Sequence, residues 1–438
     1  MTMNSKINSF IEGSIKVRYL YSACIVTTTP DVSILHDPWF TQGVYDGSWY
    51  HFPKVRRPLN KIGDVDLLFI SHIHPDHYDP QFLREYFERF GEKKILIAGH
   101  NPNILYSKMV SDGFSPQILE NVLKIGGTSI QIIPHSTGSI SDIDSAIIVK
   151  FVSEKNRQHC VVNMNDINCD SQILQKVKNA AGDVDILLCG FTGAGPYPQT
   201  FYDLSDSALK SEATIKKNLF FERYRSTTEF MNSKINVPFA GQYLLGGRFI
   251  ELNDYRGVAD AVEICDFDKK AVVLGDNGGE IDTADLIPTR VRKKKYSRLR
   301  QRSREFLLRN KRMSYESLID EDQITQLKFK RLLSLASKNA IKKSECIENF
   351  FYCIKLPGHV CAVINANRLI IDDIIFVDTR MTLPTPRSEI TIDPRYLFGL
   401  LTGIYSWNNA EVGSHFNVTR VPNEFSRNAQ RFLWHLCI

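Results

Sequence analysis

The segment Ser71-His72-Ile73-His74-Pro75-Asp76-His77-Tyr78, called here the His-rich segment, directly follows the apolar run 67–70. This order predicts a buried strand that delivers its last side chains to the rim of a sheet, where ions and substrates have access. Three imidazoles and a carboxylate within six residues form a ligand set suited to zinc, iron or manganese. His72 and His74 are expected to point the same way, and Asp76 and His77 to serve a neighbouring position. The segment therefore predicts a centre for one or two metal ions.

Two further candidate ligands stand at the ends of strand-like runs. His135 ends one run and would complete a three-histidine set with His72 and His74. Asp166 ends another, where a carboxylate could bridge two ions. Beside the His-rich segment, both residues are predicted ligands.

The residues around these ligands are interpreted by their place in the chain. Asp37 is expected to lie behind the centre, because ligating imidazoles usually donate their other N–H group to a carboxylate or carbonyl. We interpret three further histidines as structural: His36, His51 and His100.

The order of predicted elements indicates an α/β layered domain followed by a smaller one. Strands are expected at 17–29, 33–40, 67–78, 93–99, 128–136, 145–153, 159–166, 185–191 and 235–241, and later at 347–357 and 359–379. Helices are expected at 80–90, 103–110, 171–180, 206–232, 315–337 and 394–405. Because the pattern changes after Asp285, we place a metal domain at 15–285, a basic linker or helix at 286–312, and a C-terminal α+β domain at 313–438.

Length and composition limit the class of protein and the cellular compartment that we expect. At 438 residues the chain is too long for one ordinary core. The first 17 residues lack the apolar stretch of a secretory signal, and no run of about 18 apolar residues predicts a membrane span. Nine scattered cysteines without a C-x-x-C pair indicate reduced thiols. We therefore expect a cytoplasmic protein that does not bind membranes.

A strongly basic run lies between Arg290 and Arg312, with twelve Lys or Arg and one acid, Glu305. Such a run can bind nucleic acid, an acidic membrane surface or a phosphorylated ligand. It can also be the solvated face of a helix or an interdomain linker, which we favour. Only Tyr296 and Phe306 are interleaved with it as base-stacking aromatics, which argues against nucleic acid.

The ordered set of His72-x-His74-x-Asp76-His77, His135 and Asp166 resembles the metallo-β-lactamase superfamily over residues 15–280. The resemblance implies a four-layer αββα sandwich with the metal site at one edge. It also implies that His72, His74 and His135 hold one ion, that Asp76 and His77 hold the other, and that Asp166 bridges them. One departure concerns the last histidine of family hydrolases. The matching segment 236–242 has none, so Gln242 or water is expected to fill that position.

Four segments are similar to the metallo-β-lactamase-like region of CMP-N-acetylneuraminate hydroxylases: 36–40, 70–77, 191–201 and 238–241. Those enzymes insert oxygen into a nucleotide-activated sugar. Their Rieske iron–sulfur domain carries C-x-H and C-x-x-H ligand pairs, which this sequence lacks. The resemblance thus implies a hydroxylase that needs a separate electron donor.

Three functions follow from these patterns. The first is hydroxylation of a nucleotide-activated or phosphorylated sugar by iron. The second is hydrolysis of a phosphodiester, nucleotide sugar or related ester, with Asp76 or Asp166 orienting a metal-bound water. The third is a metal-binding module without catalysis. Candidate substrate contacts are Gly193, Gly195, Gln242 and His415.

Overall fold

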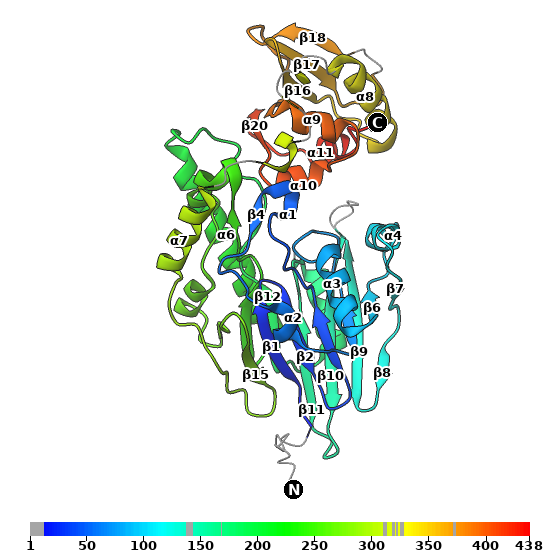
Figure 1. The fold of residues 1–438 in the computed structure, drawn as a ribbon, viewed down its shortest axis with the longest axis vertical. Helices are drawn as coiled ribbons and strands as arrows, with labels where there is room; N and C mark the ends of the chain where they lie inside the picture. Colours follow the sequence, from blue (N-terminus) through cyan, green and yellow to red (C-terminus); the bar gives the residue numbers. More distant parts are fainter. Residues whose placement is uncertain are drawn as a thin grey trace.

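The computed structural model describes residues 13–136, 143–167, 169–309, 313–317, 320, 323–324, 328–370 and 374–438. Its N-terminal part contains two large β-sheets (Figure 1). The first has seven strands in the order β15 (Gly279–Asp282), β1 (Lys16–Tyr21), β2 (Cys24–Thr28), β3 (Ser33–His36), β5 (Leu67–Phe69), β6 (Lys94–Ile97) and β7 (Pro116–Ile118). The second has six in the order β13 (Ile235–Phe239), β12 (Ile186–Gly190), β11 (Gln158–Asn163), β10 (Ile143–Val152), β9 (Thr128–Ser136) and β8 (Leu123–Ile125).

The two sheets share one inner core because successive residues of a strand point to opposite faces. Ile34 of β3 and Ile147 of β10 belong to this inner core. Their neighbours Leu35 and Ile148 point outward, into two separate outer cores. Both sheets are therefore buried on both faces, which explains the continuous apolar runs in the sequence.

Helices cover the outer faces of the sheets. The seven-stranded sheet is covered by α2 (Pro58–Ile62), α3 (Pro80–Phe90) and α4 (Ile104–Ser111). The six-stranded sheet is covered by α5 (Ser171–Ala181) and α6 (Ala208–Met231). The predicted four-layer αββα sandwich is confirmed.

The local signals that predicted α3 act as expected. The Asp79 side chain accepts a hydrogen bond from the Phe82 backbone N–H, and Pro80 occupies the first turn. Phe82, Leu83 and Tyr86 form its buried face. Asparagine and aspartate cap α4 and α5 in the same way, through Asn103 and Asp170.

The C-terminal part contains a five-stranded sheet at one end of the sandwich, uppermost in Figure 1. Its order is β18 (Ile375–Asp378), β17 (Val360–Asn365), β16 (Phe351–Leu356), β19 (Arg387–Ile392) and β20 (Phe416–Val421). Its helices are α8 (Phe329–Ser344), α9 (Pro394–Leu401), α10 (Trp407–Val412) and α11 (Arg427–Trp434), with a 3₁₀ turn η3 (Ser314–Ser317). The helix predicted at 315–337 thus begins at Phe329 and extends further. Among the described residues, no helix is long and apolar enough to cross a membrane.

Short elements connect the two parts. They are α1 (Val44–Gly47), the paired strands β4 (Trp49–Tyr50) and β14 (Leu244–Leu245), the 3₁₀ helices η1 (Gly247–Asp254) and η2 (Ala261–Asp266), and α7 (Ser297–Leu307). Helix α7 is formed by the basic run, whose residues 310–312 lie outside the described residues.

The C-terminal part is fixed to the sandwich through α1. The Tyr396 hydroxyl donates to Asp46 at 2.6 Å, and the His415 Nε2–H group donates to the Tyr45 carbonyl at 2.8 Å. A single hydrophobic core includes both Trp49 and α9. The C-terminal residues therefore form one wall near the rim that carries the His-rich segment.

Candidate metal centre

The predicted ligands converge at the carboxyl ends of strands from both sheets. The His-rich segment follows β5, His135 lies near the end of β9, and Asp166 follows β11. Five of the six predicted ligands line one cavity of about 380 Å³: His72, His74, Asp76, His135 and Asp166. The sixth, His77, is fully buried, and its Nε2 atom lies 3.3 Å from Asp166 Oδ2.

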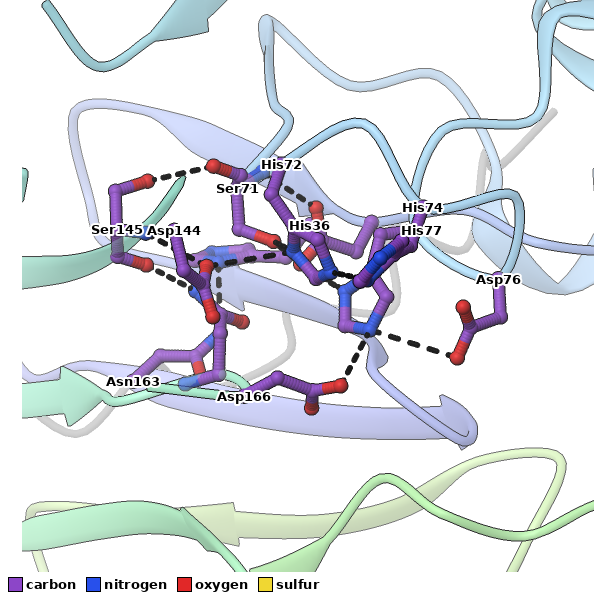
Figure 2. A network of polar contacts seen from close by, with 12 residues as sticks. His36, Ser71, His72, His74, Asp76, His77, Asp144, Ser145, Asn163 and Asp166 are labelled. Carbon is purple, nitrogen blue, oxygen red and sulfur yellow. Dashed lines mark hydrogen bonds and ion pairs between the residues drawn. The ribbon is translucent and has the colours of Figure 1, made fainter. Parts of the chain in front are cut away.

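The rings of His72 and His74 lie next to each other (Figure 2), and both residues line the cavity. His72 Nε2 lies 2.8 Å from His74 Nδ1. The outer nitrogen of each ring faces an acceptor: His72 Nδ1 lies 3.3 Å from Asp144 Oδ1, and His74 Nε2 lies 3.1 Å from Asn408 Oδ1. These acceptors place the ring protons on the outer nitrogens, so two lone pairs face each other. A metal ion, or a proton shared by the two nitrogens, would remove that repulsion.

His77 is the centre of a second group. Its Nε2 atom lies 3.3 Å from Asp166 Oδ2 and 3.6 Å from Asp76 Oδ2 (Figure 2). No hydrogen-bond acceptor or donor satisfies this buried nitrogen within the described ranges. Donor atoms of His72, His77 and Asp166 lie within 4.8 Å of one another. The two carboxylates around this nitrogen are balanced either by a proton on His77 or by a metal ion.

Asp37 lies behind His77, as predicted from the sequence. Its Oδ2 atom is 3.0 Å from His77 Nδ1, and it also accepts a hydrogen bond from the Ser71 hydroxyl at 2.8 Å. The Ser71 backbone N–H donates to Asp37 Oδ1, also at 2.8 Å. Asp37 is thus saturated and fixed, and it turns His77 Nε2 toward the other ligands. By contrast, buried His36 bonds Thr27 at 2.9 Å, in keeping with a structural role.

Asp144 is a member of the site that the sequence reasoning missed. It stands directly opposite His135 in the antiparallel pair β9–β10, so both side chains lie on one face of the sheet. Asp144 is buried, and its Oδ2 atom has no hydrogen-bond partner among the described residues. The same holds for His135 Nε2. An acidic residue immediately before the apolar run 145–152 was the available signal.

The electrostatics of the cavity favour bound cations. Burial, reinforced by His72, lowers the pKa of His74 to about 4. Burial acts on His77 in the same sense, but the carboxylates of Asp166, Asp76 and Asp37 outweigh it and raise the pKa of His77 well above its usual value. Burial would raise the pKa of Asp166, yet His77 holds it well below its usual value. The Asp166 carboxylate is therefore ionised at neutral pH.

Tyr45 also belongs to the site without having been predicted. Its buried hydroxyl donates to Asp76 Oδ1 at 2.6 Å, and the residue lines the cavity. Tyr45 and its neighbour Asp46 have positive φ angles, 53° and 55°. Such backbone strain in non-glycine residues is uncommon, and here it aims the hydroxyl at a predicted ligand.

The predicted substrate contacts divide into two pairs. Gly193 and Gly195 line the cavity. A Cβ atom on Gly193 would lie 1.9 Å from Phe220 Cζ, whereas one on Gly195 would meet nothing within 4 Å. Gly193 therefore permits close packing of its loop on α6, which is a structural requirement, while Gly195 leaves space.

Gln242 and His415 do not reach this cavity, which corrects the expectation for both. The Gln242 Nε2 group donates to the Phe52 carbonyl at 2.7 Å, and Gln242 lines a separate cavity. His415 is buried against Tyr396 and bonds the backbone of Tyr45. Neither residue completes the second metal position.

Residues 16–210 match the family model of the beta-lactamase superfamily domain. Together with the four-layer sandwich and the clustered His-rich segment, this match confirms the resemblance to the metallo-β-lactamase superfamily over these residues. The fold of this superfamily implies a metal centre and, in general, an enzyme.

Curated relatives add a narrower likeness. Over 237 residues the chain is 28% identical to a putative Rieske 2Fe-2S iron-sulfur protein of Mycolicibacterium smegmatis, covering 51% of this chain and 43% of that one. Over 245 residues it is 22% identical to the cytidine monophosphate-N-acetylneuraminic acid hydroxylase of Danio rerio, covering 53% and 39%. The chain therefore spans about 40% of the length of these relatives.

Solved structures with a similar fold include enzymes of two kinds. CmlA, a diiron beta-hydroxylase from Streptomyces venezuelae, is 15% identical with a TM-score of 0.41, covering 62% of this chain and 54% of that one. Igni18, a metallo hydrolase from Ignicoccus hospitalis, is 16% identical with a TM-score of 0.42, covering 61% and 98%.

Proposed function

We propose that this protein is a metal-dependent hydroxylase of a phosphorylated or nucleotide-activated small molecule. One observation supports the metal centre above all others: the facing nitrogens of His72 and His74, 2.8 Å apart, whose outer partners direct both lone pairs inward. Sequence similarity to hydroxylases over about half of the chain supports the reaction class. Iron at this centre would supply the activation of dioxygen.

The predicted ligands would form two metal positions. His72, His74 and His135 would hold one ion, and Asp76 and His77 the other, with Asp166 between them. Asp37 orients His77, and Asp144 takes the outer N–H group of His72, which keeps each ligand nitrogen free for a metal. Tyr45 holds the Asp76 carboxylate in place through its hydroxyl.

The cavity opposite these ligands supports an anionic substrate. Arg223 of α6 is the one permanent cation among the described residues that line the cavity, and its guanidinium lies 5.1 Å from the centre of the Phe220 ring. A phosphate or carboxylate held by Arg223 would place the remainder of the molecule toward the metal ligands. The cavity volume of about 380 Å³ falls within the range of small-molecule sites.

A second candidate is hydrolysis. The C-x-H and C-x-x-H ligand pairs of a Rieske centre are absent from these 438 residues, so a hydroxylase would depend on an electron donor outside them. Hydrolysis needs no donor, and His and Asp side chains hold zinc as well as iron. Asp76 or Asp166 could then orient the attacking water.

Metal content and the absorption spectrum of protein purified without added metal test the proposal. Iron at one or two ions per chain, with charge-transfer bands, would support hydroxylation. Zinc or manganese in a colourless protein would support hydrolysis and contradict our first choice. A protein that retains no added metal would contradict all three candidate functions, because each requires a metal centre. The pair His72→Ala/His74→Ala should lose most bound metal, whereas the control pair His159→Ala/His435→Ala, outside the cavity, should keep it.

A further inference from the structure

A second cavity lies apart from the metal centre and shares none of its described lining residues. Its volume is about 210 Å³. It is enclosed by the segment 241–243, the segment 256–263 that includes the start of η2, and the first turn of α7. Two apolar rings, Phe52 and Phe191, complete the wall. The basic run singled out in the sequence therefore contributes to a cavity.

Arg256 is the most unusual residue of this cavity. Its side chain is almost fully buried, with 1% of the residue exposed. Nη1 donates to the Tyr243 carbonyl at 3.0 Å and to Asn253 Oδ1 at 3.1 Å. Nε and Nη2 have no acceptor anywhere in the described part of the chain. Buried donors without acceptors are costly, so the Nε and Nη2 donors favour a bound acceptor, and an anion is the strongest one.

The Arg256 guanidinium is held rigidly. It lies over the Tyr243 ring, 3.7 Å from the ring centre. Trp49 stacks on the same ring, with centres 3.3 Å apart and an interplanar angle of 9°. Two groups so close to one ring centre must occupy its opposite faces, so Tyr243 is fixed between them. A preorganised guanidinium of this kind is suited to bidentate binding of a phosphate.

The charges that line the cavity are positive in sum. Arg256, Arg292, Lys295 and Arg300 contribute four cations, against two carboxylates, Asp260 and Glu263. Arg292 pairs with Asp260 at 2.7 Å, and Lys295 pairs with Glu263 at 3.3 Å. Nearby Asp276 accepts a hydrogen bond from the Tyr296 hydroxyl. Two positive charges therefore remain in excess within the lining.

The N-terminus of α7 adds to this potential. The helix has eleven residues, and the Tyr296 side chain at its N-cap makes no capping hydrogen bond. The Tyr296 backbone N–H group donates to Asp260 Oδ2 at 3.4 Å. Tyr296, Ser297 and Arg300 of this end line the cavity. Unpaired backbone N–H groups and the helix dipole make such an end favourable for anions. Three features thus meet here: the helix end, the excess charge and the unpartnered donors of Arg256.

We propose that this cavity binds the phosphate group of a small molecule, at a site distinct from the metal centre. Arg256 holds the phosphate from within, while Lys295, Arg300 and the first turn of α7 hold it at the rim. The proposal does not rest on the proposed hydroxylase function. The volume fits a phosphate with a few further atoms, not a whole nucleotide sugar.

Calorimetric titration tests the site, with inorganic phosphate and glycerol 3-phosphate as probes at constant ionic strength. We expect saturable binding of one or both at one site per chain, and a melting temperature raised by about 2 °C or more relative to matched chloride. Binding of inorganic phosphate alone would identify the free ion as the ligand, and tighter binding of the ester would identify a phosphorylated metabolite. Absence of binding by both probes would overturn the proposal.

Rim variants locate the binding without the risk of replacing buried Arg256. Lys295→Gln/Arg300→Gln should weaken phosphate binding at least tenfold and leave metal content unchanged. The control pair Lys293→Gln/Lys294→Gln removes two charges from the same run outside the cavity lining, and it should bind like the parent protein. Equal weakening in both pairs would indicate a non-specific charge effect and contradict the assigned site.

Discussion

Asp37 Oδ2 lies 3.0 Å from His77 Nδ1, and both side chains are completely buried. Asp37 has a positive φ angle of 39°, and both of its carboxylate oxygens accept hydrogen bonds from Ser71. The backbone of Asp37 is therefore strained, and its carboxylate fixes the His77 imidazole. Such an arrangement is expected of a residue that orients a ligand, because the outer partner of a metal-bound histidine sets its tautomer and direction.

Asp37→Asn should weaken metal binding by about 10- to 100-fold, since an amide no longer holds His77 in one tautomer. Equilibrium dialysis against a metal buffer would measure the affinity. Asp185→Asn is the matched control, because Asp185 is also buried and accepts from the Cys160 N–H group at 2.8 Å, at the opposite end of the sheet. Equal metal affinity in the parent and Asp37→Asn would show that Asp37 has a structural role only.

Tyr45→Phe removes the hydroxyl that donates to Asp76 at 2.6 Å. Loss of a hydrogen bond to a buried carboxylate should lower the free energy of unfolding by about 1.5–3 kcal/mol, and metal affinity should fall with it. Tyr396→Phe provides the comparison, since it removes a bond of equal length to Asp46 outside the metal cavity. Urea denaturation should show similar losses for both variants, and dialysis a loss of affinity for Tyr45→Phe alone. A loss in both would assign the effect to stability.

The sequence predicted those parts of the molecule that depend on local pattern. Helix α3 was predicted with its cap because Asp79 and Pro80 stand beside the helix that they begin. His135 and Asp166 were predicted because each ends a strand-like run, and the ends of neighbouring strands meet at one rim of a sheet. Starts of elements without such signals were less accurate: α8 begins at Phe329, well after the predicted residue 315.

The remaining site residues depend on contacts between distant segments. Tyr45 meets Asp76 only because α1 adopts a left-handed backbone, which no residue type in that segment requires. Asp144 is the second residue of β10, and its pairing with His135 follows from the register of two strands rather than from either sequence. Gln242 was placed at the metal centre by the resemblance to family hydrolases, at the position of their last histidine, yet the chain turns its amide toward Phe52. Strand register and loop direction depend on tertiary contacts, so the sequence pattern did not predict them.

Gly193→Ala should destabilise the loop beside the metal cavity. The added Cβ would lie 1.9 Å from Phe220 Cζ, so either the ring or the loop must move. Overpacking of this kind costs about 1–3 kcal/mol. Gly195→Ala is a close control, because its Cβ would meet nothing within 4 Å. Thermal denaturation should show a loss for Gly193→Ala, little change for Gly195→Ala, and recovery in the double variant Gly193→Ala/Phe220→Ala relative to Phe220→Ala alone. Absence of recovery would contradict the steric explanation.

Acid should destabilise the junction of the two parts, because His415 is buried there in its neutral form. Burial lowers the pKa of His415 to about 3. Its Nε2–H group donates to Tyr45, and Nδ1 has no partner among the described residues, so the neutral ring fits and the charged ring does not. In the unfolded chain the same residue has a pKa of about 6.5. Between these values the unfolded state binds one more proton than the folded state, so stability falls as the pH falls below about 6.5.

A histidine that stays neutral in the folded protein, as His415 does, should lower the free energy of unfolding by about 2 kcal/mol when the pH falls from 7.5 to 5. His415→Gln keeps an N–H donor for the Tyr45 carbonyl but cannot titrate, so its stability should fall less steeply with acid than that of the parent protein. Urea denaturation at pH 7.5, 6 and 5 would measure both slopes. His435→Gln is a suitable control, because His435 is only partly buried and should leave most of the parent's slope in place. Parallel pH profiles for the parent and His415→Gln would show that this histidine is not a source of the acid sensitivity.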